Sequence, residues 1–159
     1  MRIQAALAIM LLAGACQNAG PSGASPVTDA EARQVAEQAE ASFTGGNVDA
    51  IMSHYADGAT MIDGSDPTPT TDRKVQTGWA KTFASMKPAD YRVTNRQINI
   101  VGPDAFVSSG IESFTVQAGN ARPRVSARFT DVFHRGNDKQ WKIVAEHVSM
   151  PPTPTGAPQ

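Results

Sequence analysis

The sequence predicts an α+β domain in which three N-terminal helices pack on one face of an antiparallel sheet. Before Pro88, apolar residues recur at helical spacing. After Pro88, the chain consists of runs rich in β-branched and aromatic residues, separated by short turns that contain glycine, asparagine or aspartate. Helices first and strands afterwards is the order typical of α+β domains, whose helices cover one face of the sheet.

Caps and breakers set the expected helix boundaries. Thr28 and Glu31 fit a capping box, and Gly45-Gly46 ends the first helix. Asn47 can cap a second, short helix. Thr71 or Asp72 starts the third helix, and Pro88 closes it. The expected ranges are 28–44 and 47–55 for the first two helices, 60–63 for a brief strand, and 71–87 for the third helix.

Four longer strands are expected after Pro88. The turns between them are short, so consecutive strands run in opposite directions and form a meander. The expected strands are 91–101, 105–117, 124–134 and 140–149.

The strand over residues 124–134 places a carboxylate on an apolar face. Read at a period of two, its inner face carries Val125, Ala127, Phe129, Asp131 and Phe133. Its outer face carries Arg124, Ser126, Arg128, Thr130, Val132 and His134. Buried carboxylates are rare unless they are paired, hydrogen-bonded or protonated, and such conditions recur at functional sites. The pattern therefore indicates an acid that faces the interior, in either a structural or a functional role.

The first fifteen residues have the pattern of a secretory signal. A positive start at Arg2 is followed by an almost wholly apolar run over 3–13, which is shorter than the roughly twenty apolar residues of a membrane span. The residues before Cys16 resemble a bacterial lipobox, in which the cysteine becomes lipidated. They also satisfy the small-residue rule for ordinary cleavage after Ala15. Cys16 is the single cysteine of the chain, so no intramolecular disulfide can form.

We therefore expect an exported protein that is lipid-anchored at Cys16 in the periplasm. Gln17, in place of an aspartate, favours the outer membrane by resemblance to Gram-negative lipoproteins. A secreted or soluble periplasmic protein is the alternative. The expected organisation is a signal peptide over 1–15, a flexible tether over 16–27, one domain over 28–150, and a disordered proline-rich tail over 151–159.

The charge pattern argues against a nucleic-acid partner. The chain has 14 basic and 15 acidic side chains, without a block of like charge or a basic stretch interleaved with aromatics.

Two segments resemble a known family. The hairpin over 128–149 is similar to the C-terminal hairpin of SnoaL-like domains, and the segment over 46–63 is similar to their second helix and first strand. These domains belong to the nuclear transport factor 2-like superfamily, which includes ketosteroid isomerases. The resemblance implies a strongly curved sheet that wraps the helices into a cone with an apolar pocket. It is specific for the fold and weak for activity.

The ketosteroid isomerase pattern assigns roles to two aspartates. Its general base corresponds to Asp63, and its protonated oxyanion-hole acid corresponds to Asp131. Ketosteroid isomerase is itself the established example of one ionised and one neutral carboxyl in the same pocket. The oxyanion-hole tyrosine of that pattern has no counterpart, because Ala39 stands at the matching position. Loss of such a donor typically costs roughly 100- to 1000-fold in rate, which argues against steroid isomerisation.

Other residues extend this candidate site. His147 is a candidate proton carrier, or alternatively a hydrogen-bonded core or interface histidine. Asp63 has an alternative interpretation too, as a strand-end carboxylate bound to backbone amides of the next turn. The expected pocket wall consists of Tyr55, Met61, Trp79, Phe83, Phe129 and Phe133.

Three functions are compatible with these residues. The first is a pocket that binds a small apolar or carbonyl-bearing molecule without turnover. The second is an isomerase, cyclase or dehydratase with Asp63 as general base and Asp131 or His147 as proton donor. The third is a non-catalytic module that forms a homodimer through the polar outer face of its sheet. No cofactor is expected, and three scattered histidines without ligand spacing predict no metal site.

Overall fold

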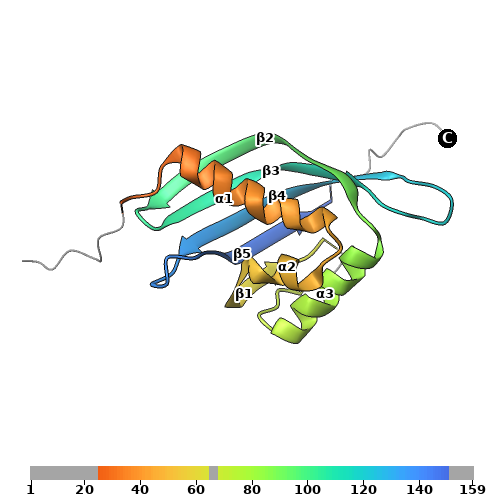
Figure 1. The fold of residues 1–159 in the computed structure, drawn as a ribbon, viewed down its shortest axis with the longest axis horizontal. Helices are drawn as coiled ribbons and strands as arrows, with labels where there is room; N and C mark the ends of the chain where they lie inside the picture. The colour runs from red at the N-terminus through yellow and green to blue at the C-terminus, as the bar shows by residue number, and fades with distance from the viewer. Residues whose placement is uncertain (1–24, 65–67, 151–159) are drawn as a thin grey trace, which may run out of the picture.

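The computed structural model describes residues 25–64 and 68–150 and has the predicted α+β architecture (Figure 1). The helical elements are α1 (Asp29–Ala41), the 3-10 turn η1 (Ser42–Thr44), α2 (Val48–Ser53) and α3 (Arg73–Ser85). The strands are β1 (Tyr55–Ile62), β2 (Ala89–Gly102), β3 (Ala105–Thr115), β4 (Arg124–Arg135) and β5 (Trp141–Ser149). The predicted signal peptide, Cys16 and the C-terminal tail lie outside the described residues.

The predicted caps begin α1, α2 and α3. The Thr28 hydroxyl accepts from the Glu31 backbone N–H at 3.2 Å, and the Asn47 side chain caps α2. Asp72, one of the two candidates for the third cap, accepts from the Lys74 N–H at 2.7 Å. The side chain of Glu31 does not complete a capping box, because its carboxylate binds Arg135 and Trp141 instead.

The sheet has the order β1-β5-β4-β3-β2, and α1 lies across its concave face (Figure 1). Strands β2 to β5 form the predicted antiparallel meander. The first strand is longer than expected and begins at Tyr55, which was expected in the second helix. It pairs in parallel with β5, with Tyr55 opposite Ile143. This long-range pairing competes with the helical preference of the segment and extends the strand.

The sheet bends in the middle of the β2–β3 pair. Asn95 has a positive φ of 53°, and the β2–β3 register shifts between Thr94 and Gln97. At Gly110 on β3, an added Cβ would lie 3.0 Å from the Thr94 carbonyl oxygen, so the close approach of the two strands favours glycine there. The bend curves the sheet around the helices and gives the cone shape that the family resemblance implied.

A β-bulge divides β5 into two halves. Val132 pairs with Ala145 whereas Phe133 pairs with Ile143, so Val144 is one extra residue on β5. Ile143 is buried before the bulge and Glu146 is buried after it. The bulge therefore turns Glu146, in place of His147, toward the interior.

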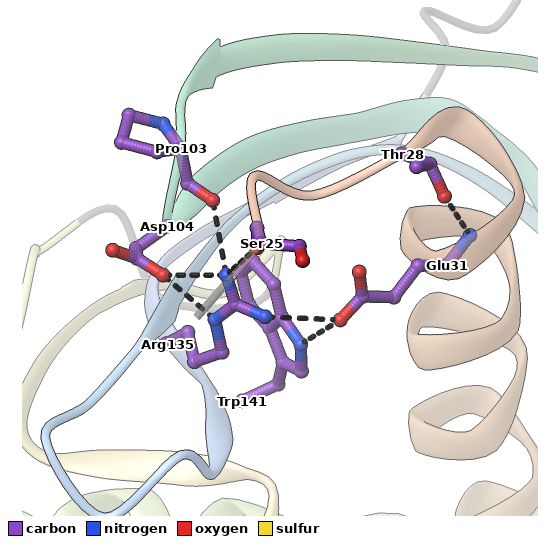
Figure 2. Close-up of polar contacts among 7 residues, drawn as sticks. All are labelled: Ser25, Thr28, Glu31, Pro103, Asp104, Arg135 and Trp141. Carbon is purple, nitrogen blue, oxygen red and sulfur yellow. Dashed lines mark hydrogen bonds and ion pairs between the residues drawn. The ribbon is translucent and has the colours of Figure 1, made fainter. Parts of the chain in front are cut away.

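One end of the core is closed by aromatic packing and by a cluster of charges. Phe106 and Phe133 are stacked with ring centroids 4.6 Å apart. Nearby, Arg135 donates to Asp104 and Glu31 and to the backbone carbonyls of Ser25 and Pro103 (Figure 2). We call this group, together with Trp141, the Arg135 cluster. It joins the N-terminal segment, α1, the β2–β3 turn and the end of β4.

The part of the chain that the structure describes contains no helix long and apolar enough to cross a membrane.

Candidate ligand pocket

A cavity of about 330 Å³ lies between α3 and the concave face of β3, β4 and β5. Gly64 and Met150 on its edge are exposed, so it reaches solvent there. Most of its wall is apolar: Phe43, Met61, Trp79, Phe83, Met86, Phe114, Val116, Val125, Ala127, Val148 and Met150. Concave, mainly apolar spaces with a few polar groups are typical ligand sites, whose volumes start at roughly 300 Å³.

Three carboxyl groups share this wall: Asp63 after β1, Glu112 on β3 and Glu146 on β5. We call them the pocket carboxyls. The remaining polar side chain of the wall is Thr82, and no lysine, arginine or histidine of the described chain lines the cavity. The polar part of this wall is therefore acidic apart from one hydroxyl.

Two tyrosines, the buried Tyr55 and the partly buried Tyr91, each bind one of the pocket carboxyls. The Tyr55 hydroxyl donates to Glu146 Oε2 at 2.5 Å, and the Tyr91 hydroxyl donates to Glu112 Oε2 at 2.5 Å. Burial and the adjacent carboxyls raise the pKa of both tyrosines, so each keeps its proton and remains a donor. Each hydrogen bond orients one carboxyl from behind the pocket wall.

Burial also favours the protonated form of the two glutamates. It raises the pKa of Glu146 to about 7; the hydrogen bond from Tyr55 counteracts this rise, and the charges of Glu112 and Asp63 add to it. Burial likewise raises the pKa of Glu112, and the hydrogen bond from Tyr91 counteracts the rise. Near neutral pH Glu146 can therefore either donate or accept a hydrogen bond.

Asp131 lies behind this wall rather than in it. It is buried on β4, between Ser108 on β3 and Glu146 on β5 in the strand register. Its Oδ1 atom has no hydrogen-bond partner among the described residues. Burial, followed by the charge of Glu146, raises the pKa of Asp131 well above its usual range. Asp131 and Glu146 thus lie side by side in the core, where the charge of one disfavours ionisation of the other, and Glu146 is on the pocket side.

A cation near this pair, Arg96, has another partner. Arg96 Nη2 lies 2.6 Å from Glu40 Oε2, and Arg96 Nη1 donates to Ser108 Oγ at 3.1 Å. Both members of the ion pair are about 11% exposed. The positive charge of Arg96 is therefore largely balanced by Glu40.

The structure places the predicted site residues in different surroundings. Asp63, Met61, Trp79 and Phe83 line the cavity. Tyr55, Phe129 and Phe133 do not: Tyr55 is buried beneath Glu146, Phe129 lies against Gly110, and Phe133 stacks on Phe106 at the closed end. These three residues, expected in the pocket wall, therefore lie outside this cavity, because sheet curvature and the helices divide one continuous inner face into separate regions.

His147 points away from the pocket. The sequence places it on one face with Trp141, Ile143 and Ala145, but the bulge at Val144 reverses the alternation and leaves His147 exposed. His147, expected as a proton carrier in the pocket, therefore lies outside this cavity.

Glu112 and Glu146 are the site residues that the sequence did not assign. The signal was a glutamate in each of two strands with predominantly apolar or small neighbours. The face of Glu146 could not be assigned by alternation, because the bulge in β5 changes the relation between residue number and direction. Glu112 follows the regular alternation of β3, on the same face as Phe106 and Phe114, so that alternation could have assigned it. None of the described residues forms a group of three or more acids, histidines or cysteines arranged to hold a metal ion.

Comparison with known families agrees with this architecture. The family profile described as "SnoaL-like domain" matches residues 32–153. The chain belongs to the SnoaL-like domain family. The match covers every element from α1 to β5 except the first turn of α1. No similar sequence was found among curated proteins.

Solved structures extend the relationship of this SnoaL-like domain to the nuclear transport factor 2-like fold. A candidate calcium/calmodulin-dependent protein kinase II association domain from Xanthomonas campestris has a TM-score of 0.70 and 24% identity, covering 80% of this chain and 94% of that one. A nuclear transport factor 2-like protein from Rhodospirillum rubrum has a TM-score of 0.63 and 18% identity, with 74% and 96% covered. A candidate ketosteroid isomerase from Shewanella frigidimarina has a TM-score of 0.62 and 18% identity, with 73% and 92% covered. At these identities the similarity establishes the shared fold.

Proposed function

We propose that this SnoaL-like domain binds a small, largely apolar molecule in the cavity between α3 and the sheet. The observation that carries the proposal is the cavity itself, with eleven apolar wall residues and three carboxyls grouped on its strand side and at the end of β1. The apolar wall provides affinity through burial of the ligand, and the carboxyls bind its polar end.

The aromatic residues do not fill this space. Trp79 and Phe83 stack on each other with centroids 5.6 Å apart, and Phe83 meets Phe114 edge to face at 5.2 Å. These contacts hold the rings along the wall, so the pocket is retained when the aromatic residues are packed. This arrangement favours a binding pocket over a vestigial one.

A cavity-filling substitution tests the proposal. Val125 lines the cavity on β4, whereas Val107 on β3 lies on the outer face of the same sheet. We expect Val125→Phe to abolish binding of 1-naphthalenemethanol in isothermal titration calorimetry and Val107→Phe to leave it unchanged. Equal affinity in both variants, or no binding to the unsubstituted protein, contradicts a ligand pocket at this site.

A second candidate function is proton transfer next to a carbonyl group. It is favoured by Asp63 and Glu146 lining the same cavity, with the charge of Asp63 contributing to the raised pKa of Glu146. Asp63 would act as the base, and protonated Glu146 would donate to the carbonyl oxygen. This assignment replaces Asp131 and His147, the donors expected from the sequence, with a group that lines the cavity.

Hydrogen exchange measures this activity directly. If the domain is such an enzyme, it accelerates exchange of the methyl hydrogens of 1-acetonaphthone in D₂O, as followed by NMR, and Asp63→Asn removes the acceleration. Binding of the ketone without accelerated exchange excludes this candidate and leaves the binding function intact.

We also propose that two copies of the domain associate through the outer face of the sheet. Arg124, Ser126, Arg128 and Thr130 are exposed there on alternate positions of β4. The similar Xanthomonas structure is described as an association domain, which supports the proposal. In sedimentation velocity, Arg128→Glu is expected to shift a dimer toward the monomer; a monomer in the unsubstituted protein excludes the proposal.

For localisation, we propose export and lipid anchoring through Cys16, supported by the lipobox-like sequence before it. The expected result is incorporation of an alkyne-labelled palmitate in bacteria that is lost in Cys16→Ser. Export without labelling supports the secreted or soluble periplasmic alternative.

A further inference from the structure

We propose that the ligand of this pocket is a lipophilic amine, bound as its ammonium ion between the pocket carboxyls and the aromatic wall. This inference rests on the proposed ligand-binding function and names the chemical class of the ligand. It follows from the charge of the wall, from the aromatic rings beside it and from the buried acid behind it.

The charge of the wall is complementary to a cation. Asp63, Glu112 and Glu146 supply three carboxyls, and none of the described wall residues is basic. Arg96 does not offset them, because its guanidinium binds Glu40 at 2.6 Å. A ligand with a positive group would form charge-assisted hydrogen bonds with the carboxylates, which are roughly twice as strong as neutral ones.

The buried pair behind the wall adds to this effect. Asp131 is about nine-tenths buried on the concave face, directly beside Glu146 in the register, and its Oδ1 has no partner in the described chain. In the core, two adjacent carboxyls resist simultaneous ionisation. A cation on the pocket side of Glu146 offsets the repulsion between the two carboxylates, so a positively charged ligand stabilises the ionised pair.

The rest of the wall fits the body of an organic cation better than a metal ion. Four aromatic rings line the cavity: Phe43, Trp79, Phe83 and Phe114. Aromatic faces attract ammonium groups, and they also bury the apolar part of the ligand. No group of acids in the described chain is arranged as a metal site, which disfavours an inorganic cation as the complement of these carboxyls.

Protonation of the pocket gives the proposal a distinct pH dependence. Glu146 is faced by Tyr55 on β1, Asp131 on β4, Glu112 on β3 and Asp63 at the end of β1. An ammonium ion favours ionised Glu146, so amine affinity rises as pH increases through the Glu146 pKa of about 7. A carbonyl ligand favours the protonated glutamate, and its affinity falls over the same interval.

Matched probes separate these possibilities in the unsubstituted protein. 1-Naphthylmethylamine and 1-naphthalenemethanol differ mainly in charge, and 1-acetonaphthone presents a carbonyl on the same ring system. Calorimetric titrations are made at about pH 6 and about pH 8, on either side of the Glu146 pKa of about 7. We expect the amine to bind at least about tenfold more tightly than the alcohol at the higher pH, and its advantage to shrink at the lower pH.

Conservative variants show which carboxyl causes the preference for the amine. Glu112→Gln and Glu146→Gln should each reduce the preference for the amine several-fold, whereas Glu37→Gln, on the exposed face of α1, should not. Folding of each variant is checked by circular dichroism, and the probe comparison in the unsubstituted protein does not depend on the variants.

The outcomes distinguish the two levels of the proposal. Binding of the alcohol or ketone without preference for the amine overturns the amine inference and leaves the pocket function standing. Tighter binding of the ketone that weakens with rising pH also overturns it, in favour of the carbonyl chemistry described above. If none of the three probes binds, both the inference and the proposed pocket function are wrong.

Discussion

Two partly buried regions of this domain balance their charges differently. In the Arg135 cluster, a guanidinium that is about 10% exposed bonds two carboxylates and two backbone carbonyls, and it lies 5.1 Å from the Trp141 ring centroid (Figure 2). Two of the pocket carboxyls have tyrosine donors, but the described wall residues include no cation. The first region uses its polar groups to hold the fold together, whereas the second places acidic groups on the wall of a cavity.

This contrast follows from the position of each region. The Arg135 cluster joins segments far apart in the sequence, so each of its bonds to α1 and the N-terminal segment closes a long loop of chain. The pocket carboxyls lie along a cavity wall, where the proposed ligand would supply a positive partner. Acids in such a position cost folding stability, which is typical of functional sites.

Removal of Arg135 should have the largest effect on stability. Arg135→Met removes hydrogen bonds to Glu31, Asp104 and two backbone carbonyls, and bonds to charged groups contribute roughly 1.5–3 kcal/mol each. Because the two carboxylates are 37% and 38% exposed and water can hydrate them in the variant, we expect the free energy of unfolding to fall by about 3 kcal/mol in total. Urea unfolding measures this change. The control is Arg33→Met, which breaks an exposed ion pair to Asp29 on α1 and should cost less than about 1 kcal/mol. Equal losses in the two variants would show that the Arg135 cluster does not bind these segments together.

Glu146 should make stability depend on pH. The unfolded carboxyl ionises near 4.5, whereas the folded pKa is about 7, so between these values the folded state retains a proton that the unfolded chain has lost. The free energy of unfolding therefore falls as pH rises across this interval. The difference corresponds to a destabilisation on the order of 3 kcal/mol above the folded pKa.

Two variants check the sign of this effect by urea unfolding at both ends of the interval. Glu146→Gln should change the free energy of unfolding more favourably at a pH above the folded pKa of about 7 than at a pH below about 4.5. Tyr55→Phe should do the reverse, because it removes the hydrogen bond that lowers the Glu146 pKa. A change of the same size at both pH values in either variant contradicts the assignment.

The helix cap beside the Arg135 cluster provides a smaller test. Thr28→Ala removes the hydroxyl that accepts from the Glu31 N–H, and it should cost about 1 kcal/mol in the free energy of unfolding. Thr28→Ser retains a capping hydroxyl and should cost less. If both variants lose the same amount, the methyl group of Thr28, and not its cap, supports α1.

The smallest effect is expected at His147. Because this side chain is exposed on the outer side of β5, His147→Ala should change the free energy of unfolding by less than about 0.5 kcal/mol. The affinity for 1-naphthalenemethanol should also remain unchanged. Loss of binding would place the imidazole in the pocket and contradict the register of β5.

Local chemistry determined the elements that the sequence predicted correctly. Thr28, Asn47 and Asp72 begin their helices because each side chain bonds a backbone N–H only two or three residues away. The strand over 124–134 kept its predicted faces because β4 pairs with β3 without a register shift. Asp131 is therefore buried as its position in the alternation indicated. These outcomes depend on interactions within one element or between adjacent strands.

Only the tertiary structure decided which acids meet the pocket. The extra residue Val144 turns Glu146 inward and His147 outward, and the close approach at Gly110 sets the curvature that brings β3 over the cavity. The parallel pairing of β1 with β5 then places Tyr55 beneath Glu146, across 91 residues of sequence. Such positions depend on long-range pairing and packing, whose energies are not encoded in the periodicity of any single segment. For this reason the sequence alone determined the fold and its buried aspartate, whereas the pocket and its excess of acid were decided by the curved sheet.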